Sequence, residues 1–257
     1  MKDELRSLRF KQRNRGRYWW FHQPNHNYVP PIFEALTDDE WEVMSQWYEE
    51  TDKRDSAGEV NIPCLSLISG LIGGNGIPNI VQLGHYEGFS TLLLGFVMRR
   101  MGFKHSIFSV DIDPQVTEFT ESWVRRAGLD AYVKLVVDSS DAARLPQLAR
   151  NYFGAEITTI FIDSSHQYHH TLRELELWYP HLQPFGFIMM HDASAYAGDF
   201  DATGEGGVLR ALREWTAVQH VSHLLINEEV YVGHPPLAYI DPCGLAIIQK
   251  KMDRAVP

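Results

Sequence analysis

The sequence predicts an α/β fold, a doubly wound and mostly parallel seven-stranded sheet with an antiparallel hairpin at one edge. Apolar runs of about five residues alternate with helical patterns, which is typical of βαβ units with right-handed crossovers. Polar side chains gather directly after these runs, at the strand ends where open α/β sheets bind ligands. The last two runs are joined only by a loop with Pro235 and Pro236, so they are expected to pair antiparallel.

Residues 1–62 are predicted to form an N-terminal arm and a helical extension, and residues 63–257 the main domain. Residues 13–21 mix basic and aromatic side chains, a composition that can stack on nucleic-acid bases. Prolines follow soon after, so an arm that packs on the domain or on a second subunit is the preferred interpretation. Thr37 and Glu40 then have the spacing of a helix capping box.

An apolar stripe at helical spacing follows this capping box. Its members are Trp41, Met44, Trp47 and Tyr48. The stripe is expected in the core or at a subunit contact, and part of a lid over a substrate is the alternative.

Residues 79–91 are the stretch around which the main domain is organised. Ile80, Val81 and Leu83 predict a short buried strand. Gly84 follows it directly, where a glycine lets the chain bend sharply and a ligand approach the backbone. The helix that starts near Ser90 directs its first N–H groups toward the crevice above the strand end.

The remaining elements continue the alternation of strands and helices. Helices are expected at residues 63–72, 91–98, 114–127, 142–152, 166–182 and 208–218, with the first ended by residues 73–76. Strands are expected at residues 105–111, 133–137, 158–162, 187–190, 222–226 and 245–249, with a turn at 184–186 and a Gly- and Asp-rich loop at 193–207.

The composition limits the classes of function. A length of 257 residues with 44% hydrophobic side chains allows one large core. The formal net charge of −10 disfavours nonspecific nucleic-acid binding. Only Cys64 and Cys243 are present, which indicates neither a disulfide framework nor a zinc site. Without an apolar membrane span or the apolar core of a signal peptide, a cytoplasmic protein is expected.

Polar residues follow five of the predicted strands, and in a parallel sheet these ends meet at one edge. Asp111 stands where an acid after the second strand accepts the hydroxyls of a ribose. A helix N-cap is the alternative role, but Asp113 fits that cap better and leaves Asp111 for a ligand. The groups expected to converge are residues 84–90, Asp111 and Asp113, residues 138–141, residues 163–166, and His191 with Asp192.

Over about residues 63–250, these motifs resemble the class I S-adenosylmethionine-dependent methyltransferases. The similarity is greatest to the O-methyltransferases around catechol O-methyltransferase and the macrolide-sugar O-methyltransferases. Gln82 stands where that family usually has an acid. The matching segments are residues 83–90 (methionine side), 109–114 (ribose), 136–141 (adenine side), and 161–168 with 184–192 (acceptor side).

The resemblance implies S-adenosylmethionine as the cofactor and a Rossmann-like methyltransferase fold. His166 stands where relatives place the general base, and Asp163 is the second catalytic candidate. A neutral imidazole, with a pKa near ~6.5, is a suitable base at physiological pH. The implied cofactor-binding residues are Gly84, His85, Tyr86, Gly88, Ser90, Asp111, Ser140, Asp141 and Asp163.

The resemblance also implies a divalent cation, magnesium or manganese, held by Asp163, His191 and Asp192. Relatives have Asp or Glu where this chain has His191, and magnesium prefers oxygen ligands. A histidine suits manganese, iron or zinc better. The alternatives are that no metal binds, or that His191 and Asp192 only hydrogen-bond the neighbouring loop.

The expected activity is O-methylation of a hydroxyl on a small polar acceptor, a sugar of a glycosylated natural product or polysaccharide, or else a phenol. A homodimer is the expected assembly. The alternatives on the same fold are a nicotinamide-dependent oxidoreductase and a non-methylating relative such as an oxygenase component. Only the basic N-terminal arm suggests RNA methylation.

Overall fold

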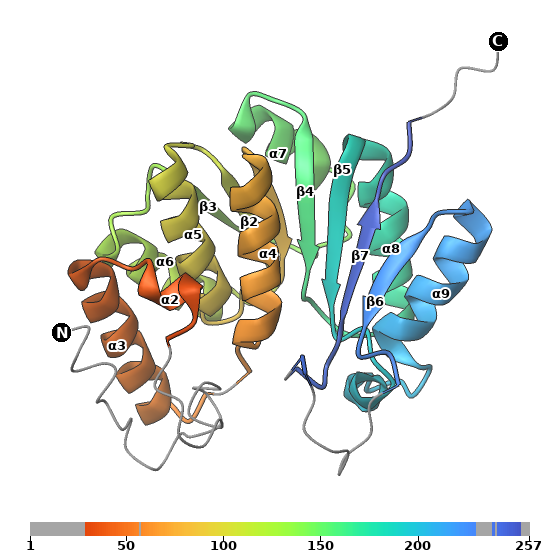
Figure 1. Cartoon of the computed structure of the whole chain (residues 1–257), viewed down its shortest axis with the longest axis horizontal. Helices are drawn as coiled ribbons and strands as arrows, with labels where there is room; N and C mark the ends of the chain where they lie inside the picture. The colour runs from red at the N-terminus through yellow and green to blue at the C-terminus, as the bar shows by residue number, and fades with distance from the viewer. Residues whose placement is uncertain (1–28, 57, 230–237, 240, 253–257) are drawn as a thin grey trace.

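The computed structural model describes residues 29–56, 58–229, 238–239 and 241–252. Its sheet has the strand order β3-β2-β1-β4-β5-β7-β6 (Figure 1). Strands β1 to β5 pair in parallel, and β7 pairs antiparallel with both β5 and β6. The predicted doubly wound sheet with an antiparallel edge is therefore confirmed. The strands are β1 (Ile80–Leu83), β2 (Ile107–Asp111), β3 (Val133–Val137), β4 (Ile157–Ile162), β5 (Leu182–His191), β6 (His223–Ile226) and β7 (Leu245–Gln249).

Helices cover both faces of the sheet, so the core has two apolar halves. Ile80 of β1 faces one half and Val81 faces the other, as the alternation of side chains along a strand requires. On the first side lie α2 (Pro31–Glu34), α3 (Asp38–Lys53), α4 (Ile62–Asn75), α5 (Phe89–Met101) and α6 (Pro114–Arg126). On the second lie α7 (Leu145–Phe153), α8 (Tyr168–Trp178) and α9 (Gly207–Gln219), and the short helices η3 (Tyr179–His181) and η4 (Tyr196–Phe200) lie in the loops.

Several element boundaries differ from the prediction by a few residues, among them the end of α4 and the start of β5. Helix α4 continues through Gly73 and Gly74, the first residues of the stretch expected to end it. It stops at Gly76, the last residue of that stretch, whose φ of 63° gives the left-handed C-cap. The expected turn at residues 184–186 is part of β5. Phe185 takes a positive φ there. Its N–H donates to the carbonyl of Lys250 beside β7, and this hydrogen bond keeps the residues within the strand.

The N-terminal extension joins the main core. The predicted capping box forms at the start of α3, with Thr37 and Glu40 each accepting from the other's backbone N–H. Glu40 also pairs with Arg99 and Arg100 of α5 at 2.6 and 3.1 Å. The Trp41 stripe is buried, which confirms the core interpretation. The aromatic arm at 13–21 lies outside the described residues, and the division at residue 62 stays a prediction.

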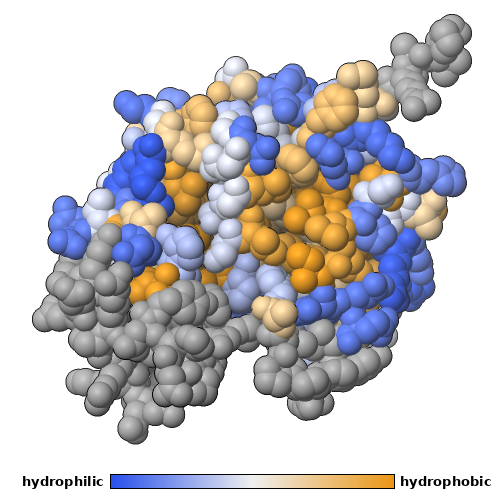
Figure 2. All heavy atoms as spheres, viewed as in Figure 1, coloured by the Kyte–Doolittle hydropathy of each residue, from blue (hydrophilic) through white to orange (hydrophobic). Residues whose placement is uncertain are grey.

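Part of the molecular surface is apolar. Figure 2 shows an apolar area beside α4, over the β5–β7–β6 part of the sheet. Leu224, paired with Ile247, is 56% exposed, and Ile247 and Phe187 are only partly buried. No helix within the described ranges is long and apolar enough to cross a membrane.

Candidate active site

The loop after β1 has a backbone path that requires glycine. Gly84 has a φ of 86°, and a Cβ atom there would lie 2.0 Å from the carbonyl oxygen of Asp163, which follows β4. Gly88 has a φ of 90° and starts α5 as its N-cap. The loop is therefore pressed against the end of β4, so the predicted cofactor loop and the predicted acceptor side lie next to each other.

Gln82 has a defined role in place of the acid usual in the resembling family. Its buried side-chain amide donates to Ser90 Oγ at 2.7 Å and accepts from Thr91 Oγ1 at 2.9 Å. A neutral amide both donates and accepts, so it can bind both hydroxyls where a carboxylate can only accept. These two hydrogen bonds fix the first turn of α5 to β1.

Asp111 ends β2 and organises the loop from the other side. Its Oδ2 accepts the backbone N–H groups of His85 and Tyr86 at 3.1 and 2.9 Å. Its Oδ1 accepts from the N–H of Asp113, at 3.0 Å. Asp113 is the N-cap of α6, as predicted. Asp111 lines the cavity but is already engaged by the protein, so it positions the loop as well as facing a ligand.

His85 is buried with both ring nitrogens occupied. Nδ1 lies 3.0 Å from Ser109 Oγ and Nε2 lies 3.0 Å from Thr117 Oγ1. Burial lowers the pKa of His85 to about 4, against the opposing effect of Asp111. The imidazole is therefore neutral at physiological pH and ties β2 and α6 to the loop.

The adenine-side residues separate in the structure. Ser140 lines the cavity, and its hydroxyl contacts His170 Nε2 at 2.8 Å and the buried carboxylate of Glu174. Asp141 instead pairs with Arg173 at 2.6 Å and is not among the lining residues. Neither His170 nor Glu174 was among the predicted cofactor-binding residues, because both lie on α8 rather than at a strand end.

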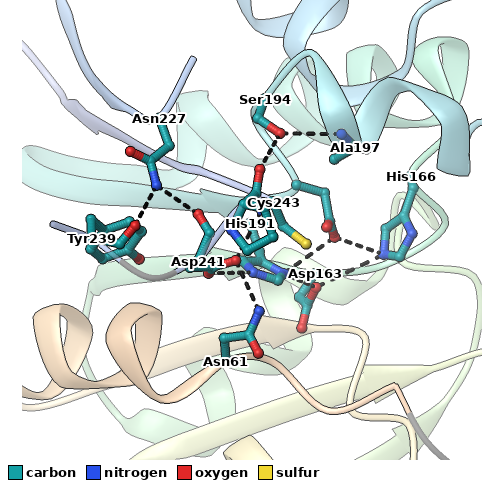
Figure 3. Close-up of polar contacts among 12 residues, drawn as sticks. Asn61, Asp163, His166, His191, Ser194, Ala197, Asn227, Tyr239, Asp241 and Cys243 are labelled. Carbon is teal, nitrogen blue, oxygen red and sulfur yellow. Dashed lines mark hydrogen bonds and ion pairs between the residues drawn. The ribbon is translucent and has the colours of Figure 1, made fainter. Parts of the chain in front are cut away.

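The acceptor-side residues form one cluster (Figure 3). His191 ends β5, and its Nδ1 lies 3.3 Å from Asp163 Oδ1 and 3.2 Å from Asp192 Oδ2. His166 Nε2 lies 3.1 Å from Asp192 Oδ2 and 3.9 Å from Asp163 Oδ1. Both His166 and Asp192 have φ of 58°, a strained backbone that is common at functional sites.

Two residues that support this cluster were not predicted from the sequence. Asp241 is fully buried and its Oδ2 lies 2.9 Å from His191 Nε2. Asn61, predicted to lie in a polar linker, donates to Asp241 Oδ1 at 2.9 Å. The sequence contained one indication of the position of Asp241, the antiparallel direction predicted for the last strand. Because β7 runs opposite to β1–β5, an acid before its start lies at the edge where the parallel strands end.

Many of these groups line one cavity of about 830 Å³. This is within the usual range of 300–1,000 Å³ for small-molecule sites. Trp47 and residues 58–61 also line it, so the N-terminal extension forms part of the wall. Gly88 and Asp141 are not among its lining residues. The predicted residues that line it are Gly84, His85, Tyr86, Ser90, Asp111, Ser140, Asp163, His166, His191 and Asp192.

The donor set does not fit the magnesium ion that the resemblance implies. Magnesium prefers oxygen ligands, whereas His191 Nδ1 lies within hydrogen-bond range of both carboxylates that would hold the ion. Cys64 and Cys243 also lie near His191. Burial raises the pKa of both thiols, and thiols are poorer metal ligands than thiolates. An ion that takes nitrogen ligands, such as manganese, would have to replace any proton on Nδ1 of His191. Binding of an ion therefore stays a prediction.

Comparison with known proteins agrees with the fold. Residues 81–193 match the family model described as a methyltransferase domain. No curated protein matches the sequence. The chain is 17% identical to the O-methyltransferase of Bacillus cereus in complex with SAH, covering 87% of this chain and 96% of that one, with a TM-score of 0.63.

Two further solved structures have the same architecture. The O-methyltransferase TomG of Streptomyces achromogenes, involved in tomaymycin synthesis and solved in complex with SAM, is 17% identical. The match covers 87% of this chain and 96% of that chain, at a TM-score of 0.59. The SAH-bound methyltransferase PaMTH1 of Podospora anserina is 15% identical. The match covers 86% of this chain and 92% of that chain, at a TM-score of 0.60. At these identities the likeness shows the fold, and it confirms the predicted methyltransferase fold.

Proposed function

We propose that this chain, whose residues 81–193 form a methyltransferase domain, transfers the methyl group of S-adenosylmethionine to a hydroxyl oxygen of a small polar acceptor. One observation carries the proposal. The loop after β1 and the cluster of His166, Asp163 and Asp192 line the same cavity. A cofactor held at Gly84 therefore lies beside ionisable groups that can take a proton from an acceptor.

The proposed reaction is an in-line displacement. The acceptor oxygen forms a bond to the methyl carbon as the carbon–sulfur bond breaks, and the sulfonium becomes a neutral thioether. The acceptor O–H must lose its proton, and His166 is the proposed base. Holding the two reactants in line supplies much of the rate enhancement.

The contact with Asp192 determines which nitrogen of His166 acts. A carboxylate only accepts hydrogen bonds, so Nε2, 3.1 Å from Asp192 Oδ2, carries the proton in the neutral imidazole. Nδ1 is then the nitrogen that takes the acceptor proton. Asp192 thus fixes the tautomer and orientation of His166, and Asp163, which also lines the cavity, adds negative charge beside it.

The proposed acceptor is a sugar hydroxyl of a glycosylated natural product or polysaccharide, with phenols as the runner-up. Polar side chains on both walls of the cavity support a hydroxylated acceptor, among them Asn61 and Gln167. Phe200 lines the same cavity, 42% exposed and with its ring centre 6.1 Å from that of His166. An exposed aromatic face beside the base suits the flat face of a ring. The homodimer and the cytoplasmic location also stay proposals.

A binding and transfer experiment tests the function. Calorimetric titration with S-adenosylmethionine and with NAD compares the two cofactors, and a methyl-transfer screen over glycosides and catechols follows. Binding of S-adenosylmethionine with transfer to a hydroxyl supports the proposal. Preferential binding of NAD would favour an oxidoreductase. Binding of S-adenosylmethionine without transfer to any acceptor would favour a non-methylating relative.

A further inference from the structure

The side chain of His191 is held at both ends by carboxylates. On its Nε2 side, Asp241 Oδ2 lies at 2.9 Å. Asp241 is fully buried, and its Oδ1 accepts from Asn61 Nδ2 at 2.9 Å and from the backbone N–H of Cys243 at 3.0 Å. Both oxygens of this carboxylate therefore act as hydrogen-bond acceptors. Figure 3 shows these residues converging on one side of the imidazole.

On its Nδ1 side, His191 meets two more acceptors, Asp163 Oδ1 at 3.3 Å and Asp192 Oδ2 at 3.2 Å. An ionised carboxylate cannot donate, and a neutral imidazole has one donor nitrogen. Hydrogen bonds at both ends therefore require a proton on each nitrogen.

We infer that His191 is a fixed imidazolium that supplies the positive charge which the resembling enzymes take from a metal ion, and that Asp241 is its positioning residue. The role of His191 in methyl transfer rests on the proposed function, whereas its charge state does not. Methyl transfer by this chain then needs no divalent ion, because the charge between Asp163 and Asp192 comes from the protein.

The groups that face His191 come from several elements. They are Asp163 after β4, Asp192 after β5, Asp241 and Cys243 before β7, Tyr239 in the same loop, and Cys64 on α4. Burial opposes the charge on His191, but the carboxylates overcome it and raise its pKa well above the ordinary value. The two thiols and Tyr239 have raised pKa values because they are buried, so they stay neutral beside the imidazolium.

The charge on His191 has a consequence for His166, because both contact Asp192 Oδ2. The imidazolium of His191 offsets the negative charge of Asp192, the carboxylate that also holds Nε2 of His166. Removal of the His191 charge should therefore lower the rate of methyl transfer.

Nitrogen NMR of the full chain with labelled histidine tests the charge state directly. The His191 signal is identified by its loss in His191→Gln. We expect wild-type His191 to show two protonated nitrogens at pH 7, in protein that has been treated with a chelator and holds no stoichiometric metal by elemental analysis. One unprotonated nitrogen at pH 7 would overturn the inference. So would a bound metal whose removal shifts the His191 signals. Neither readout depends on methyl transfer.

Asp241→Asn tests the positioning role, and Asn227→Ala is its matched control. Asn227 holds the same loop by donating to the backbone carbonyls of Tyr239 and Asp241 at 2.7 and 2.8 Å, without touching the carboxylate. We expect Asp241→Asn to lose the doubly protonated His191 signal and to lower turnover, with Asn227→Ala unchanged in both. An equal change in both variants would mean that Asp241 only anchors the loop. Chelator should change wild-type turnover less than twofold, and a loss restored by magnesium or manganese contradicts the inference.

Discussion

At the scale of single residues, Asp192 lies between the imidazoles of His166 and His191, and the surroundings of the two rings distinguish their proposed roles. Its Oδ2 is 3.1 Å from His166 Nε2 and 3.2 Å from His191 Nδ1. His191 is 6% exposed and enclosed by carboxylates, whereas His166 is partly exposed and lines the cavity. The accessible histidine is thus the candidate base, and the enclosed one provides charge.

His166→Ala removes the proposed base without touching the cofactor loop. We expect turnover to fall by about 10²–10⁴-fold, the usual contribution of a general base, while the calorimetric Kd for S-adenosylmethionine changes less than twofold. His169→Ala is the control, since His169 is exposed and pairs with Glu205. Equal turnover in wild type and His166→Ala would remove His166 from the reaction.

Asp111→Asn keeps the shape of the side chain but removes its charge. The carboxylate accepts three backbone N–H groups of the chain and faces the cavity, and charge-assisted hydrogen bonds are about twice as strong as neutral ones. We expect the Kd for S-adenosylmethionine to rise about tenfold, or ~1.4 kcal/mol. Asp113→Asn is the matched control, because asparagine also caps helices. Unchanged affinity in Asp111→Asn would exclude the ribose assignment.

At the scale of elements, the site depends on how closely the β1 loop approaches the end of β4. The approach is possible because Gly84 has no side chain, and the hydrogen bonds of Gln82 and Asp111 hold the loop in that path. The N-terminal extension also lines the cavity. Trp47 of α3 donates its Nε1–H to the carbonyl of Glu87 in this same loop, at 2.8 Å.

Gly84→Ala should show the cost of this approach. Its Cβ would meet the Asp163 carbonyl at 2.0 Å, and its φ of 86° is unfavourable for alanine. Gly76→Ala is the control, because Gly76 has a φ of 63° but open space around it. We expect Gly76→Ala to lose about 1–2 kcal/mol of unfolding free energy from the left-handed backbone alone, and Gly84→Ala to lose clearly more. Equal losses in urea unfolding would mean that the loop is not pressed against β4.

At the scale of the whole molecule, buried ionisable groups make stability depend on pH. His85 has a pKa of about 4 in the folded chain, against ~6.5 when unfolded. Between these values the unfolded chain binds the proton more readily, so His85 contributes stability that falls as the pH is lowered through this window. Asp201, with a pKa lowered to about 2 by hydrogen bonds from Thr203, Gly207 and Tyr168 that outweigh its burial, loses its contribution only at more acidic pH.

His85→Gln isolates this effect, because glutamine has hydrogen-bonding groups but does not titrate. We expect the wild type to lose up to about 3 kcal/mol of unfolding free energy between pH 7 and pH 4 on account of His85. The stability difference between wild type and variant should therefore shrink as the pH falls, in urea unfolding at several pH values. A difference that is constant with pH would show that His85 is not a buried neutral imidazole.

The sequence predicted the sheet because periodicity is a local property. The strand runs at residues 80–83 and 133–137, the capping box at Thr37 and the cap at Asp113 all agree with the structure. Some boundaries differ. Helix α4 ends at Asn75, within the stretch predicted to end it. Residues 184–186 were predicted as a turn but join β5, because the chain beside β7 supplies hydrogen bonds from a distant part of the sequence.

The sequence by itself determined the fold class and the edge of the sheet at which the acids collect, since strand period and strand direction place those residues without further information. Only the tertiary structure decided the electrostatics of the site. Asn61 and Asp241 lie 180 positions apart in the chain, and Asn61 donates to the carboxylate of Asp241 that holds His191. The charge of an imidazole depends on which groups surround it in space, and a local sequence pattern does not specify groups that are distant in the chain.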